Sequence, residues 1–149
     1  MQSMLKLLKI KIFVVSVLIL FSLPSCRKDS FRFPYVSINL NLGINSDLGD
    51  LAAGGLKLLP KNMYGGVGGL IVYQDFDYNY FVFDAACTHD YYDGCYVEPG
   101  ESFPELMVCP CCSSSFLLSS DGNVFKGPAK YPLVQYLSFR DGEILRVQN

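Results

Sequence analysis

Hydrophobic and polar residues alternate along several short segments of the chain, beginning at residues 36–42. In this segment every second residue is Val, Ile or Leu, and the residues between them are Ser or Asn. A period of two predicts a half-buried β-strand. Runs rich in β-branched and aromatic residues predict further strands at 68–74, 80–87, 105–109, 123–127, 133–139 and 143–147. The pattern therefore predicts an all-β fold of short antiparallel strands.

Polar and glycine-containing segments separate the predicted strands. Residues 75–79 are expected to connect a hairpin, and the Asp-Gly pairs at 121–122 and 141–142 stand where tight turns would join strands. Residues 47–59 have mixed character and allow a short helical turn. Four glycines between residues 65 and 69 indicate a bend.

The first 25 residues have the organisation of a signal peptide. Three lysines precede the apolar run at 12–21, which is too short to span a bilayer of ~30 Å. The run is followed by Leu-Pro-Ser-Cys at 23–26, which resembles the lipobox of bacterial lipoproteins. We therefore expect a lipoprotein signal peptide at 1–25, a lipid on Cys26, a tether at 26–35 and one folded domain at 36–149.

The charge of the exported part argues against nucleic acid as a partner. Three of the 12 Lys and Arg residues precede Cys26, whereas all 14 acidic residues follow it, so the part from Cys26 onward has a net charge of −5. There is no basic patch of the kind that binds nucleic acid.

We expect the protein in the bacterial cell envelope, anchored by its lipid in the outer membrane and facing the periplasm or the cell surface.

Six cysteines are the main candidates for chemistry. Adjacent thiols such as Cys111 and Cys112 rarely bridge each other, because so small a ring is strained. If Cys26 carries lipid, five cysteines remain, and an odd number cannot all pair in disulfides. The single histidine, His89, follows Cys87 in a Cys-x-His pattern, and Cys109 begins a Cys-x-x-Cys pattern. These patterns favour a metal site with His89 as a ligand.

The sequence "CTH…C…CPCC.S.F", followed by "DGNVFKGPAKYPL", resembles a Rieske iron–sulfur domain of the cytochrome bc type. The resemblance covers residues 71–147. It implies a Rieske-like β-sandwich with a smaller subdomain, in which two loops hold a [2Fe–2S] cluster and a disulfide ties the loops together. It also implies that residues 127–133, including Pro128, form a loop that covers the cluster.

By position, the resemblance assigns Cys87, His89, Cys109 and Cys112 as cluster ligands, with Cys112 standing where the family has a second histidine. It assigns Cys95 and Cys111 to the disulfide, although the first loop is three residues longer than usual. Three thiolates and one disulfide would use all five cysteines. Among the neighbouring residues, Ser114 matches a serine that bonds a bridging sulfide, Phe116 replaces a hydroxyl-donating tyrosine, and Ser113 replaces a glycine.

The resemblance implies a membrane-anchored protein that transfers single electrons to an unidentified redox partner protein. We expect an electron-transfer protein or an oxidoreductase subunit rather than an independent enzyme, and the sequence indicates no small-molecule substrate. Two alternatives are a non-redox lipoprotein whose cluster site has decayed and is stapled by disulfides, and a closed zinc site made by the same three cysteines and one histidine.

Overall fold

Most of the predicted strands belong to one six-stranded antiparallel sheet. The computed structural model describes residues 31–49 and 51–149. The strand order is β1 (Asn39–Gly43), β10 (Ile144–Gln148), β9 (Gln135–Asp141), β4 (Tyr80–Asp84), β3 (Leu70–Gln74) and β2 (Leu56–Leu59). Leu42 and Leu59, from the two edge strands, pack in the same buried cluster, so the sheet curls around one of its faces.

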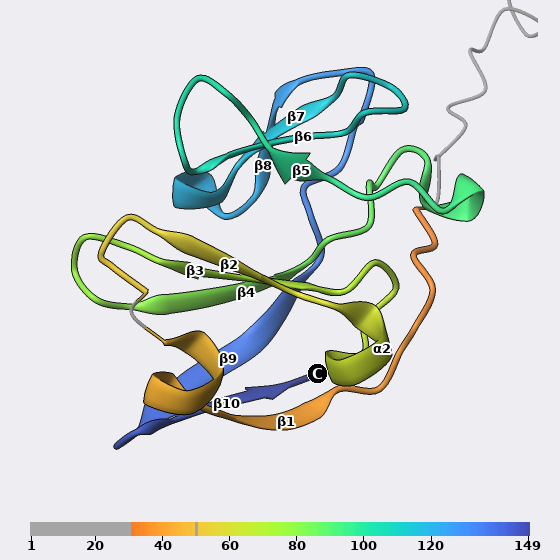
Figure 1. Ribbon diagram of the computed structural model, residues 1–149. Helices are drawn as coiled ribbons and strands as arrows, with labels where there is room; N and C mark the ends of the chain where they lie inside the picture. The colour runs from red at the N-terminus through yellow and green to blue at the C-terminus, as the bar shows by residue number, and fades with distance from the viewer. Residues whose placement is uncertain (1–30, 50) are drawn as a thin grey trace, which may run out of the picture. The chain divides into compact units, whose positions relative to one another are not determined.

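A second, smaller sheet lies against the outer face of the curled sheet (Figure 1). Its strand order is β5 (Glu98–Pro99), β6 (Leu106–Val108), β7 (Ser115–Leu117) and β8 (Asn123–Lys126). Short helical turns lie outside the sheets, namely η1 (Ile44–Leu48), α2 (Lys61–Tyr64), η2 (Tyr91–Asp93) and η3 (Leu118–Ser120). The all-β fold of short antiparallel strands that the sequence predicts is confirmed.

Strand β3 is buried on both faces and separates two hydrophobic cores. Leu70 and Val72 point into the core enclosed by the curled sheet, whereas Ile71 and Tyr73 point into the core between the two sheets. This explains why the sequence of β3 is continuously apolar rather than alternating. Met107 and Phe116 complete the second core from the small sheet.

The residue pattern did not predict three of the strands, and the helical turns only partly overlap the segment that was expected to contain one. The segment 47–59 contains β2, its first two residues belong to η1, and α2 follows it. Strand β5 has only two residues, and β7 follows serines that read as a loop. The Asp-Gly pair at 141–142 does begin the turn of the β9–β10 hairpin, whereas the pair at 121–122 belongs to a longer connection that includes η3.

The small sheet is an insertion between two neighbouring strands of the large sheet. The chain leaves the large sheet after β4, forms β5 to β8, and returns as β9, which pairs with β4 through Val82↔Tyr136 and Phe83↔Gln135. The last residue of β4, Asp84, also donates its backbone N–H to the carbonyl of Val134 at 2.7 Å. The start and end of the insertion are therefore fixed to each other.

The carboxylate of Asp84 is fully buried at this junction. It accepts hydrogen bonds from the backbone amides of Val67, Gly68 and Ala86 at 2.6–2.8 Å, and from the hydroxyl of Tyr136 at 2.8 Å. A Cβ atom at Gly68 would lie 2.4 Å from the backbone nitrogen of Ala86. Only glycine at this position therefore allows the bend to lie so close to the backbone of Ala86. Asp84 thus joins the bend at 65–69, the end of β4 and strand β9.

We predict that Asp84→Ala lowers the free energy of unfolding by at least about 3 kcal/mol. The variant leaves several buried donors unpaired, and each unpaired donor costs about 1–3 kcal/mol. Denaturant titration of the full chain measures the change. The control is Asp77→Ala in the exposed β3–β4 turn, for which we expect a change within about 0.5 kcal/mol. Equal effects of the two variants would contradict the role given to Asp84.

Candidate metal centre

Two loops of the small sheet carry the cysteines other than Cys26. The first loop, residues 85–97, connects β4 to β5, and the second loop, residues 109–114, connects β6 to β7. A third segment, residues 127–134, connects β8 to β9 and is called the return loop below. All three leave the ends of paired strands, so the sheets determine where the loops begin and end.

Backbone hydrogen bonds close the first loop on itself. Cys87 donates its N–H to the carbonyl of Cys95 at 2.9 Å, and Val97 donates to Ala85 at 2.8 Å. Between these bonds the chain forms the short helix η2, which ends at Gly94 in a left-handed conformation with φ 73°. Cys87 and Cys95 are therefore neighbours across the base of the loop, although they are eight positions apart in sequence.

The second loop is a tight turn. Cys109 donates its N–H to the carbonyl of Ser114 at 2.8 Å and accepts a hydrogen bond from the N–H of Ser113 at 2.9 Å. Ser113 has φ 59°, in the left-handed region that glycine adopts most readily. This is the position at which the resemblance implies a glycine, so serine there bears a conformational cost.

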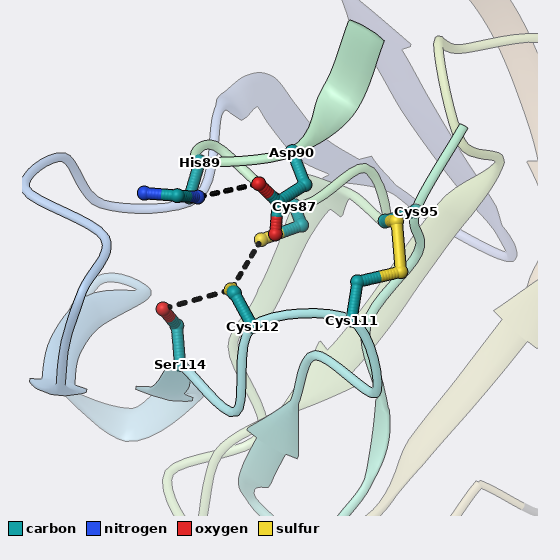
Figure 2. The surroundings of a disulfide bond; sticks show 7 residues. All are labelled: Cys87, His89, Asp90, Cys95, Cys111, Cys112 and Ser114. Carbon is teal, nitrogen blue, oxygen red and sulfur yellow. Dashed lines mark hydrogen bonds and ion pairs between the residues drawn. A yellow bond between two sulfur atoms is a disulfide. The ribbon is translucent and has the colours of Figure 1, made fainter. Parts of the chain in front are cut away.

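A disulfide between Cys95 and Cys111 joins the two loops, with 6.3 Å between their Cα atoms. It is the pair that the resemblance assigned to a disulfide. Figure 2 shows the bond at one side of the loops, with the side chain of Cys112 turned to the other side. Adjacent cysteines therefore serve different purposes: Cys111 holds the loops together, and Cys112 faces the remaining thiols.

Three free thiols and one carboxylate lie together on the side away from the disulfide. The sulfur atoms of Cys87, Cys109 and Cys112 and a carboxylate oxygen of Asp90 all lie within 4.8 Å of one another. The sulfurs of Cys87 and Cys112 are 3.7 Å apart. Cys87 and Cys109 are fully buried and belong to the core between the two sheets, whereas Cys112 is partly exposed.

The structure brings together three of the four ligands predicted from the sequence, and places His89 outside the group. Nδ1 of His89 lies 2.5 Å from Oδ1 of Asp90, and the His89 side chain is 43% exposed. Asp90 takes its place in the group of potential ligands. Asp90 was not predicted as a ligand from the sequence. Its position next to His89 in the same loop was the feature that could have indicated it.

Their surroundings change the pKa values of Cys87, Cys112 and Asp90. Burial raises the pKa of Cys87 to about 12, although the backbone amides of Asp90 and His89 act in the opposite direction. Burial also raises the pKa of Cys112, against hydrogen bonds with Ser114. For Asp90, burial acts to raise the pKa, but hydrogen bonds with Cys112 and His89 and the charge of His89 outweigh it and lower the pKa. A metal that binds the thiols must therefore displace their protons.

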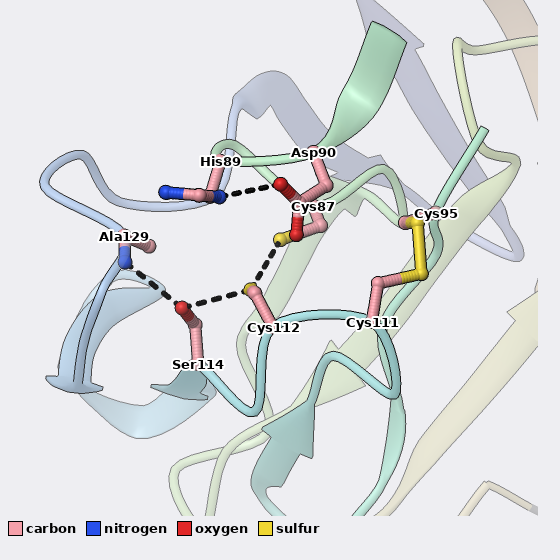
Figure 3. Close-up of polar contacts among 8 residues, drawn as sticks. All are labelled: Cys87, His89, Asp90, Cys95, Cys111, Cys112, Ser114 and Ala129. Carbon is pink, nitrogen blue, oxygen red and sulfur yellow. Dashed lines mark hydrogen bonds and ion pairs between the residues drawn. A yellow bond between two sulfur atoms is a disulfide. The ribbon is translucent and has the colours of Figure 1, made fainter. Parts of the chain in front are cut away.

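The return loop lies against both cysteine loops. The buried hydroxyl of Ser114 accepts hydrogen bonds from the thiol of Cys112 at 3.1 Å and from the N–H of Ala129 at 2.8 Å (Figure 3). On the first loop, the hydroxyl of Thr88 donates to the carbonyl of Tyr131 at 2.7 Å. Ser114 is thus the link between the second loop and the return loop.

The other two residues singled out near the site have different surroundings. Phe116 is fully buried in the core between the sheets, on strand β7. Pro128 is exposed, and its neighbour Ala129 is buried and makes the contact with Ser114. Cys26, the apolar segment at 12–21 and the predicted signal peptide lie outside the described residues.

The donor set has the chemistry of a site for iron or zinc. Thiolates bind both metals, and imidazole and carboxylate groups are their usual partners. Each loop offers two candidate donors, Cys87 with His89 or Asp90 on the first loop, and Cys109 with Cys112 on the second loop. In number and chemistry, the residues present therefore suit either one metal with four ligands or a two-iron cluster with two ligands on each iron.

Comparisons with known proteins give structural similarities only. A plasma membrane Rieske protein from the cyanobacterium Synechocystis PCC 6803 matches with 23% identity and a TM-score of 0.48, over 77% of this chain and 100% of that chain. A chain from the complex of reduced oxygenase and oxidized ferredoxin in carbazole 1,9a-dioxygenase matches with 21% identity and a TM-score of 0.46, over 66% and 92%. The ferredoxin of Sphingomonas yanoikuyae B1 matches with 16% identity and a TM-score of 0.47, over 78% and 99%.

Neither a protein-family model nor a curated protein matches the sequence. The three structural similarities have TM-scores below 0.5 and identities below 25%, so they do not assign the chain to a family. Within the described part of the chain, no helix has the length and apolar character needed to cross a membrane.

We predict that Ser113→Gly raises the free energy of unfolding by about 0.5–1 kcal/mol. A side chain in the left-handed region costs about 1–2 kcal/mol, part of which the greater freedom of glycine in the unfolded chain offsets. Denaturant titration with the disulfide intact measures the effect. The matched control is Ser119→Gly in the exposed turn η3, which should give no gain. A loss of stability in Ser113→Gly would show that the serine side chain is needed there.

Proposed function

We propose that the chain is a Rieske-like iron–sulfur protein that binds a [2Fe–2S] cluster and transfers single electrons. The observation that carries this proposal is the convergence of Cys87, Cys109 and Cys112 from two loops that a separate disulfide joins. The loop sequences that resemble those of Rieske domains support the same function. A bound cluster would supply reversible one-electron oxidation and reduction.

The chain's own residues would hold the cluster and determine its surroundings. Cys87 and Cys109 are fully buried, which keeps water from two of the thiolates. Ser114 would hold Cys112 in place, since its hydroxyl bonds both that thiol and the return loop. The return loop would cover the site, because it contacts the second loop through Ala129 and the first loop through Thr88.

The ligands favour a low reduction potential. Two-histidine ligation gives Rieske centres potentials of ~−150 to +300 mV, against ~−400 mV for all-cysteine plant-type clusters. Cys112 in place of a histidine adds a negative charge, which disfavours reduction. Phe116 acts in the same direction, because it has no hydroxyl to donate to a ligand sulfur. We therefore propose a potential near the lower of these figures.

Zinc is the second candidate, and the compactness of the site favours it. With Zn–S bonds of ~2.3 Å, the edge of a regular tetrahedron is about 3.8 Å. The sulfurs of Cys87 and Cys112 are 3.7 Å apart, and all four donor atoms lie within 4.8 Å of one another. A closed structural zinc site would stabilise the two loops without redox chemistry.

We also propose that a lipid on Cys26 anchors the protein at the bacterial cell envelope, in the outer membrane. The apolar run at 12–21 and the Leu-Pro-Ser-Cys sequence support the lipid anchor. The redox partner would be another protein that approaches the exposed side of the loops, where Cys112 and the neighbouring His89 are accessible.

We predict that the full chain, purified or reconstituted without oxygen, contains iron and acid-labile sulfide in equal amounts, about two of each. Visible absorption and an electron paramagnetic resonance signal after reduction should accompany them. Cys109→Ser should lose most of the iron, because it removes a buried thiolate. Cys26→Ser is the matched control and should keep the iron, since the proposed lipid site is separate from the cluster.

Other metal contents would decide against the proposal. One zinc per chain without sulfide would replace the cluster by the structural zinc site. Neither iron nor zinc in the wild-type protein would leave a binding or structural protein whose loops only the disulfide joins.

A further inference from the structure

The side chain of Asp90 lies next to the free thiols and is mostly buried. Its carboxylate lies within 4.8 Å of the sulfurs of Cys87, Cys109 and Cys112, and its side chain is 17% exposed, against 43% for His89. Figure 2 shows the carboxylate between the ring of His89 and the thiol of Cys87. We propose that Asp90 supplies the fourth donor of this centre and that His89 positions its carboxylate from outside. This inference rests on the proposed metal centre.

The contact between His89 and Asp90 places the carboxylate, and not the imidazole, next to the thiols. Nδ1 of His89 lies 2.5 Å from Oδ1 of Asp90, and the carboxylate lies between the His89 ring and the thiol of Cys87 (Figure 2). The other ring nitrogen points away from the thiols in Figure 2. His89 is thus a positioning residue for Asp90 in this arrangement.

The backbone of the first loop explains why Asp90 faces the thiols. Asp90 immediately precedes η2, and its carbonyl accepts hydrogen bonds from the N–H groups of Asp93 at 3.1 Å and Cys95 at 3.4 Å. The hydroxyl of Tyr91 donates to the carbonyl of Arg32 at 2.7 Å and fixes the other side of the turn. The extra length of this loop therefore forms a turn that holds the Asp90 backbone next to the disulfide-linked Cys95.

A carboxylate in this position is chemically suited to the metals considered. Aspartate oxygen binds zinc at ~2.0–2.2 Å and is a common ligand of iron. With Cys87, Cys109 and Cys112 it makes a set of four anionic ligands, one charge more negative than a set with neutral His89. An iron–sulfur cluster held in this way would be harder to reduce than the cluster with three cysteines and one histidine.

Selective labelling tests the assignment without any substitution. The chain contains one histidine, so growth with ¹⁵N-histidine labels His89 alone. Pulsed electron paramagnetic resonance of the reduced, iron-loaded full chain should show no nitrogen coupling of the strength typical of a bound ligand. Strong coupling to ¹⁵N would identify His89 as the ligand and overturn the role of Asp90, while leaving the proposed iron–sulfur function intact.

Three variants of the full chain provide the second test, each measured by metal content under competition from a chelator. Asp90→Asn should lower the apparent metal affinity on the order of 100-fold and change the spectrum, because an amide is a poor ligand. His89→Gln should keep the spectrum and lower the affinity about tenfold, the lower end of the range for a group that orients a ligand. Asp93→Asn removes the same charge in the same loop and should have no effect.

Other results decide separately on the assignment of Asp90 and on the proposed function. If His89→Gln loses the metal and Asp90→Asn keeps it, the assignment of Asp90 is wrong. If the wild-type chain holds zinc, Co²⁺ is the probe, and its visible bands should shift in Asp90→Asn and remain in His89→Gln. If the wild-type chain binds none of these metals, the proposed function fails, and that result is distinct from a change of ligand.

Discussion

The disulfide between Cys95 and Cys111 is the constraint on which the candidate centre depends. The donor atoms come from two loops separated by strands β5 and β6, and the disulfide joins these loops on the side away from the free thiols. A cross-link over 16 residues contributes ~3 kcal/mol in the chain-entropy account. Because this cross-link is independent of any metal, it can hold the two loops and their three free thiols close together before a metal binds.

The strands on either side of the insertion connect the disulfide-linked loops to the rest of the fold. The loops belong to an insertion whose first and last strands, β4 and β9, are hydrogen-bonded neighbours, and the buried Asp84 joins that pair to the glycine bend. Cys87 and Cys109 lie in the same apolar core as Ile71 and Phe83 of the large sheet. The site is therefore continuous with the core, and a metal there would stabilise the contact between the two sheets.

The residue pattern predicted most of the fold, and its failures have local causes. Alternating and β-branched runs identified the longer strands, whereas β7 was missed because "SSSF" has the composition of a loop and becomes a strand by pairing with β6 and β8. The resemblance of the two loops to those of Rieske domains assigned Cys87, Cys109 and Cys112 as potential ligands. Asp90 could not be recognised in the same way, because a loop carboxylate is normally solvated, whereas this one lies within 4.8 Å of the three free thiols.

X-ray absorption at the iron edge of the anaerobically loaded full chain would show whether the three thiols bind a metal together. We expect a first shell dominated by sulfur, one light atom for every two irons, and a second iron as the next neighbour. A first shell of oxygen and nitrogen, unchanged when Cys87, Cys109 and Cys112 are replaced by serine, would contradict this expectation.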